Sequence, residues 1–199
     1  KIGEDIDLFI TDFSDKKLYR YNILENTHYE VCSFNKNPNG VYYDHLNNRL
    51  LVVFWGWNAP IYEVDIVTGT YSSIINTGLS NLDGITMDQC GNIYVSAWSS
   101  NAIHKYTGDF SETEIIIDGL SAPADICYSP ANNVIGIPNS GNNSVNFVNA
   151  SCDNSTLQSF SNLRKVLKTV NLLGQEKTNN PFQLEIYDNG SVNKKHILR

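Results

Sequence analysis

Basic side chains and long hydrophobic runs are both scarce in this sequence. Lysine and arginine together number 14 among 199 residues, against 21 aspartates and glutamates, so the formal net charge is −7. Nucleic-acid binders and basic membrane-surface helices both need a concentration of positive charge, and the shortage argues against both classes. The longest purely apolar run, Leu50 to Trp55, is far shorter than the roughly 20 residues that a transmembrane helix requires.

Motifs of common enzymes and metal sites are missing as well. The sequence has no Gly-x-Ser-x-Gly elbow and no phosphate-binding loop. The four histidines lack the spacing of metal ligands or of a catalytic triad, and His104 is expected at the surface. The absence of a Cys-x-x-Cys pair argues against a structural zinc site, although the chain has four cysteines, Cys32, Cys90, Cys127 and Cys152.

What the sequence does contain is aromatic, glycine-rich and unevenly charged. Eleven Tyr, eight Phe, three Trp and thirteen Gly, with abundant Asn, are typical of a turn-rich β protein, and an apolar fraction of 41% excludes wholesale disorder. Residues 1–153 hold seven basic and eighteen acidic side chains, a net of −11, whereas residues 154–199 hold seven and three, a net of +4. The asymmetry predicts two parts with different roles, joined by a polar stretch at 151–162.

A repeat predicts the fold of the first part, residues 1–150. Aligning Gly40, Gly84 and Asp125 superimposes three similar segments with periods of 44 and 41 residues. Each segment has a short apolar strand, a polar turn and further strands separated by Gly, Asn or Asp, which indicates antiparallel hairpins. A four-stranded unit that recurs every 40-odd residues is typical of a β-propeller blade, so the fold class is all-β.

The predicted strand count leaves the propeller incomplete. The chain enters at the second strand of a blade, two complete blades follow, and the last blade has three strands, which gives about three and a half blades. Propellers typically have 4–8 blades in a closed ring. No start Met or signal peptide is visible, and we expect the N-terminal half of a roughly six-bladed ring to lie upstream. Edge-to-edge dimerisation and a tail strand that caps the last blade are the alternatives.

The segment GLSNLDGITMDQCGNIYVSAWSSNAIHKY resembles an NHL-type or gluconolactonase-like propeller repeat, and the likeness covers residues 8–150. The last blade is similar to terminal blades of secreted propellers from Bacteroidetes. The resemblance implies that Asn39 and Asp83, at one repeat position, can be metal ligands for Ca²⁺, Mg²⁺ or Mn²⁺ in a lactonase-type hydrolase. The third repeat has Ala124 there, with Asp125 one place on. Alternatively, Asn-Gly and Asp-Gly are simply favoured turn dipeptides.

Aromatic residues recur at the end of the second strand of each blade. Phe13 and Trp98 align there, and Trp55 and Trp57 fall in the matching loop. Trp55, Trp57 and Trp98 on one rim are candidates for binding a small molecule, a glycan or a protein segment. Packing between blades is the other interpretation.

The tail, residues 163–199, predicts a strand at 166–173 and a hairpin that pairs 182–187 with 192–198. NLLGQE, NNPF and IYDNGSVNKK resemble the type A C-terminal sorting tail of the type IX secretion system, with Asn171 and Asn189 departing from the usual acidic residues. The resemblance implies a translocon and a sortase as partners, and a secreted or outer-membrane-surface location in a Bacteroidetes bacterium. An ordinary C-terminal hairpin is the alternative. The residues that carry the signal are Gly174, Pro181, Tyr187, Asp188, Gly190, Lys194 and Lys195.

The sequence therefore predicts a secreted, non-enzymatic propeller that acts as a binding module and is exported by the type IX route. A metal-dependent lactonase is the alternative function. A third hypothesis is a truncated fragment in which only the export tail works.

Overall fold

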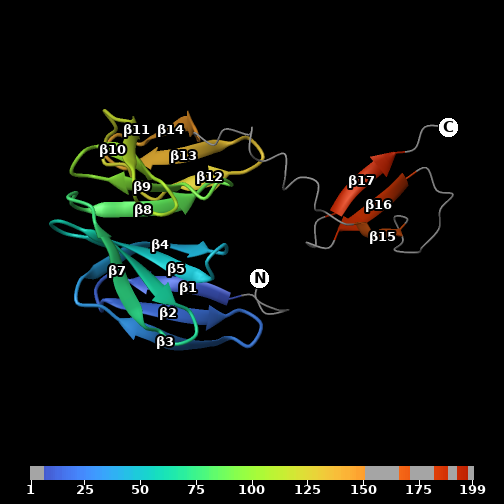
Figure 1. Cartoon of the computed structure of the whole chain (residues 1–199), viewed down its shortest axis with the longest axis horizontal. Coiled ribbons are helices and arrows are strands. Elements are labelled where there is room, and N and C mark those ends of the chain that lie inside the picture. Colours follow the sequence, from blue (N-terminus) through green and yellow to red (C-terminus); the bar gives the residue numbers. More distant parts are fainter. Residues whose placement is uncertain (1–6, 151–165, 171–181, 188–191, 197–199) are drawn as a thin grey trace. The chain divides into compact units, whose positions relative to one another are not determined.

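A computed structural model describes residues 7–150, 166–170, 182–187 and 192–196 of the chain (Figure 1). The structure divides into two compact units, Lys1–Cys152 and Asp153–Arg199. All regular structure in the described ranges is β-strand, and none of it is helix. Within these ranges, therefore, no helix is long and apolar enough to cross a membrane.

The first unit consists of four antiparallel sheets, which we call blades I to IV, and they follow one another in chain order (Figure 1). Blades I and IV have three strands each: β1 (Asp7–Asp12), β2 (Lys17–Asn22) and β3 (Thr27–Ser33) in blade I, and β12 (Cys127–Ser129), β13 (Val134–Asn139) and β14 (Ser144–Asn149) in blade IV.

Blades II and III have four strands each. Blade II contains β4 (Asn37–Asp44), β5 (Arg49–Trp55), β6 (Pro60–Asp65) and β7 (Tyr71–Asn76). Blade III contains β8 (Leu82–Met87), β9 (Ile93–Ala97), β10 (Ala102–Tyr106) and β11 (Thr113–Ile117). The all-β propeller architecture with four-stranded blades is confirmed, and the described strands number three, four, four and three, as predicted.

The first strand of blades II, III and IV lies innermost, because β4 packs on β8 and β8 packs on β12. β1 packs on β4 in the way that β5 packs on β8. β1 is therefore the second strand of its blade, as the sequence alignment predicts.

Three apolar cores join the blades, one between each neighbouring pair. The sequence run that begins at Leu50 forms β5, in which alternate side chains face opposite sides: Leu50 and Val52 pack toward blade I, and Leu51 and Val53 toward blade III. All four are 0% exposed. Because β5 is buried on both faces, it has no polar alternation, and each such side chain contributes about 1.5–3 kcal/mol of hydrophobic stabilisation.

Aspartates close the turns after the innermost strands. Asp44 Oδ1 accepts hydrogen bonds from the backbone N–H groups of Leu46 (3.2 Å) and Asn47 (3.3 Å). Asp88 Oδ1 does the same for Cys90 and Asn92, both at 2.9 Å. Turn geometry therefore explains both carboxylates.

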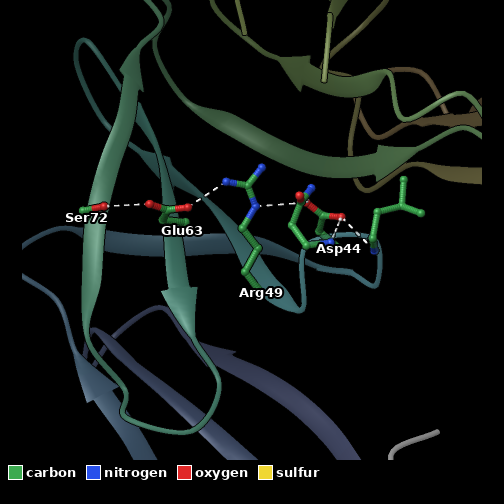
Figure 2. A network of polar contacts seen from close by, with 6 residues as sticks. Asp44, Arg49, Glu63 and Ser72 are labelled. Carbon is green, nitrogen blue, oxygen red and sulfur yellow. Dashed lines mark hydrogen bonds and ion pairs between the residues drawn. The ribbon is translucent and has the colours of Figure 1, made fainter. Parts of the chain in front are cut away.

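A polar network crosses all four strands of blade II (Figure 2). Arg49 donates from Nε to Asp44 Oδ2 at 2.9 Å and from a terminal nitrogen to Glu63 Oε2 at 2.7 Å, and Ser72 Oγ donates to Glu63 Oε1 at 3.0 Å. The Asp44 side chain is 0% exposed and that of Arg49 is 20% exposed. Each charged group already has partners, so we interpret the network as structural, although it lines an open hollow of about 500 Å³.

The second unit is described as one antiparallel sheet of β15 (Val166–Val170), β16 (Phe182–Tyr187) and β17 (Val192–His196), in the order β15-β16-β17. The register pairs Val166 with Tyr187 and Phe182 with His196.

Candidate functional site

A β-bulge recurs in the innermost strand of blades II and III, at the predicted metal-ligand position. Between the pairs Pro38–Phe54 and Val41–Val52, β4 uses one residue more than β5. β8 repeats this irregularity against β9. The residues inside the two bulges are Asn39-Gly40 and Asp83-Gly84. A bulge bends the strand and re-aims its side chains, and bulges are frequent beside functional sites.

The hydroxyl groups of Thr11 and Ser96 bond backbone groups in the bulges and in the segment before β12. Thr11 Oγ1 donates to the carbonyl of Asn39 at 2.5 Å, and Ser96 Oγ donates to the carbonyl of Ala124 at 2.8 Å. Ser96 Oγ also accepts from the Gly84 N–H at 2.7 Å. Thr11 and Ser96 occupy the same position on the second strand of their blades. Sequence reasoning missed them, although a hydroxyl recurring two repeats apart was a usable signal.

The bulge glycines bring neighbouring blades into backbone contact. A Cβ atom at Gly40 would lie 2.5 Å from the carbonyl oxygen of Asp83. One at Gly84 would lie 2.5 Å from the Ile126 nitrogen and 2.7 Å from the Asp125 Cα. Asn39 and Asp83, in the innermost strands of blades II and III, and Asp125, two residues before the innermost strand of blade IV, therefore lie side by side.

The Asp83 carboxyl is half-buried in this arrangement. Burial raises its pKa above the ordinary value, and the neighbouring Asp125 carboxylate raises it further, while Trp98 and Asn39 act in the opposite direction. The indole nitrogen of Trp98 is buried, and its N–H stabilises the charged form of the nearby Asp83 carboxyl.

Asp125 and Asn39 flank Asp83 on either side. The Asp125 side chain is open to solvent on one side, but surrounding protein partly desolvates it and raises its pKa. Its Oδ1 accepts the Ile126 N–H at 3.0 Å. Asn39 donates from Nδ2 to the Leu82 carbonyl at 3.1 Å, a bond that fixes its amide against the next blade.

An aromatic row begins beside these polar groups. Phe13 and Trp55 meet edge-on with their ring centroids 6.4 Å apart, and Trp55 and Trp98 meet edge-on at 4.9 Å. The three rings come from blades I, II and III, so this part of the aromatic rim packs between blades, as in the second interpretation of the sequence. Trp57 is different: its side chain is 86% exposed.

The predicted metal ligands are only a partial fit to a divalent cation. The structure brings Asn39 and Asp83 together, with Asp125 next to them, which supplies a few hard oxygen atoms. Calcium takes 6–8 oxygen ligands, so these side chains alone do not make a coordination shell. Among the residues that the structure describes, no three His, Cys, Asp or Glu side chains gather as a metal site.

The prediction that His104 lies at the surface is wrong. His104 is 8% exposed, and its Nε2 lies 2.8 Å from Ser100 Oγ. Burial lowers the pKa of His104, which favours the neutral ring. Its strand is the third of blade III, sandwiched between β9 and β11, and the sequence pattern gave no sign that this strand is buried.

The sorting-signal residues belong to the second unit. Tyr187 ends β16, and Lys194 and Lys195 lie in β17, opposite Leu184 and Gln183. The other four, Gly174, Pro181, Asp188 and Gly190, lie outside the described residues.

The first unit is similar to solved propeller structures. A chain of a nidogen/laminin complex matches with a TM-score of 0.61 and 17% identity, over 71% of this chain and 55% of that chain. A protein of unknown function from Bacteroides thetaiotaomicron VPI-5482 matches at 0.61 and 14%, over 71% and 44%. Virginiamycin B lyase from Staphylococcus aureus matches at 0.53 and 18%, over 74% and 53%.

These identities support the propeller fold alone, and the chain spans about half the length of the structures it matches. No protein-family model matches the sequence, and a search of curated proteins finds no relative. The chain has an NHL-like β-propeller fold.

Proposed function

We propose that this protein is a secreted or cell-surface propeller that binds a partner at the inner-strand bulges. The observation that carries the proposal is the pair of carboxylates, Asp83 and Asp125, held side by side with raised pKa values next to Trp98. Placing two like charges together in a partly desolvated site opposes stability, and such arrangements concentrate at functional sites.

The chemistry of the site favours a ligand that brings positive charge or N–H donors. The carboxylates can accept hydrogen bonds, and indole rings attract cations through their faces. Residues 1–153 carry a net charge of −11, which steers a basic partner toward the protein. A basic segment of a protein partner meets these requirements.

A peptide titration tests this proposal. Trp55 and Trp98 lie at the site and report binding through intrinsic fluorescence. An oligolysine peptide is expected to change the emission of the wild type, whereas an oligoglutamate peptide of equal length is not. Asp83→Asn and Asp125→Asn should each weaken oligolysine binding several-fold.

The control is Asp109→Asn, which removes one negative charge from an exposed turn of blade III. Its effect should be small, because it changes the net charge equally but leaves the bulges intact. If all three variants lose affinity equally, the binding is a general charge effect and the proposed site is wrong.

Export by the type IX route is the second part of the proposal, supported by the three motifs of residues 163–199. A reporter fused to residues 154–199 and expressed in a Bacteroidetes host should reach the medium or the cell surface. Retention in the periplasm would contradict this assignment. A Gly190→Pro variant of the same fusion provides the matched control.

A metal-dependent lactonase remains the alternative, because the structure brings Asn39 and Asp83 together at the positions that the family resemblance implies. Gluconolactone hydrolysis that is abolished by a chelator, restored by Ca²⁺, Mg²⁺ or Mn²⁺ and lost in Asp83→Ala would support it. Calorimetric titration with each metal alone gives a readout that does not depend on activity. An Asp83→Ala variant with unchanged metal affinity would remove this alternative.

A further inference from the structure

Two indole rings beside the candidate site meet at nearly a right angle. The planes of Trp55 and Trp98 are 76° apart, and their centroids are separated by 4.9 Å. When one aromatic ring meets another edge-on, the two ring faces form a corner on each side of the contact. A cation in such a corner lies over two ring faces at once, and indole attracts cations more strongly than the other aromatic side chains.

Both indoles keep part of their surface open. Trp55 and Trp98 are only partly buried, whereas Phe54, next to Trp55 in the chain, is 0% exposed. Phe13 extends the aromatic surface, because its ring meets that of Trp55 at 67° and is 43% exposed. The rings that pack between blades therefore still present aromatic surface to a ligand.

Negative charge lies beside this corner without a cation to balance it. The Trp98 indole is close enough to stabilise the Asp83 carboxylate, and the Asp125 carboxylate lies close enough to oppose its ionisation. Among the described residues, the ion pairs involve neither Asp83 nor Asp125. A positively charged ligand at this corner therefore meets two carboxylates that no basic side chain of the described ranges neutralises.

Protein donors already use part of the hydrogen-bonding capacity of these carboxylates. Side-chain N–H groups of Trp98 and Asn39 stabilise charged Asp83, and Asp125 Oδ1 accepts the Ile126 N–H at 3.0 Å. A primary ammonium is strongly hydrated and needs acceptors for three N–H groups. A quaternary ammonium has no N–H group, and its methyl groups can pack on the indole faces. Charge and aromatic surface, more than free acceptors, are what the corner offers a cation.

We propose that the corner between Trp55 and Trp98 binds a quaternary ammonium group, carried by a trimethylated lysine side chain or by free choline. The inference rests on the proposed function, because it names the chemical class of cation that the same site takes. The indole faces attract the cation, and the charge of Asp83 and Asp125 adds to this attraction.

Calorimetric titration of the full 199-residue chain tests the inference with one short, otherwise uncharged peptide in three forms. The forms carry lysine, trimethyllysine, or a neutral analogue with a tert-butyl group in place of the trimethylammonium. Trimethyllysine should bind roughly fivefold more tightly than lysine, because its weakly hydrated cation contacts the ring faces directly. The neutral analogue has the same shape without the charge and should bind more weakly than trimethyllysine.

The peptide series separates this inference from the proposed function. If lysine binds as tightly as trimethyllysine, the site does not select a quaternary ammonium and the inference is wrong, while the proposed function stands. Equal binding of the neutral analogue and trimethyllysine would also overturn it, because apolar contact alone would then explain the affinity. If oligolysine binds and none of the three peptides does, only the inference fails. If oligolysine does not bind either, the proposed function fails with it.

Substitutions locate the cation at the corner. Trp98→Leu removes one aromatic wall and should weaken trimethyllysine binding roughly fivefold. Trp57→Leu is the matched control, because it also removes an indole, but one that is 86% exposed in the loop after β5. Unchanged binding by Trp98→Leu, or an equal loss in both variants, would contradict the assignment. Circular dichroism shows whether each variant is folded, and the peptide series on the wild type needs no variant.

Choline distinguishes the two sources of the ammonium group. Added to the complex, it should displace the trimethyllysine peptide, and failure to do so would overturn the inference, because the peptide would then be held by its other groups. Titrated alone, choline that binds more tightly than the peptide assigns a free small molecule as the ligand. Tighter binding of the peptide assigns a modified side chain.

Discussion

Gly84→Ala tests the claim that backbone contact between blades III and IV builds the site. Gly84 lies in β8 with an ordinary backbone conformation, because its φ is not among the positive values. The strand conformation alone favours alanine at this position, because glycine in a strand interior lowers stability by roughly 0.5–1 kcal/mol relative to alanine. Local propensity thus predicts that the variant is stabilised.

Packing predicts the opposite. The new methyl group would lie 2.5 Å from the Ile126 nitrogen, 2.7 Å from the Asp125 Cα and 2.8 Å from Asp125 Oδ1. Two of these atoms belong to the backbone and cannot rotate away. Inserting a methyl into a well-packed interior costs about 1–3 kcal/mol, and we expect the upper part of that range here. The corresponding fall in melting temperature is roughly 4–12 °C.

Gly136→Ala is the matched control. It also changes a strand glycine to alanine, but its new methyl would meet the Phe147 ring at 3.6 Å, an ordinary van der Waals contact. Its stability should therefore equal or slightly exceed that of the wild type. Thermal and urea unfolding followed by circular dichroism measure both effects. A Gly84→Ala variant at least as stable as the wild type would refute the argument that blades III and IV touch at this point.

Three further predictions concern charged groups. The raised pKa of Asp83 means that its ionisation opposes folding: the protonated carboxyl costs nothing at low pH, and stability is lost as the pH rises through the folded-state pKa. The melting temperature of Asp83→Asn should therefore exceed that of the wild type at pH 7, with the gain shrinking toward pH 3. The lowered pKa of His104 means that stability falls as the pH drops below the ordinary value of 6.5, and His104→Gln should show a smaller fall over that window in thermal melts. Arg49→Met should lower the free energy of unfolding in urea by about 2–3 kcal/mol, because it leaves the fully buried Asp44 without its cation. Lys17→Met is the control for Arg49→Met: it breaks an exposed ion pair with Glu30 and should leave the free energy of unfolding almost unchanged.

The strands could be predicted from the sequence because they depend on local patterns. Periods of 41 and 44 residues and Asx turns such as those at Asp44 and Asp88 do not depend on distant contacts. Strand bounds agree within a few residues: for example, the predicted strand at 182–187 coincides with β16, and the predicted strand at 192–198 compares with the observed β17, Val192–His196.

The candidate site could be predicted only in part, because its geometry depends on contacts between blades. The repeat aligned Asn39 with Asp83, but it placed Asp125 one position away from the ligand. The structure brings Asp125 beside Asp83 across Gly84, a contact that no single repeat encodes. The burial of His104 was missed for a similar reason: its neighbours on β9 and β11 surround it only after the sheet forms.

The serial packing of blades has a consequence for how the first unit comes apart. Each core joins one blade to the next, so a linear row should fray from its ends and not melt in a single concerted step. Amide hydrogen exchange should then be slowest in β5 and β9 and fastest in β1 and β14.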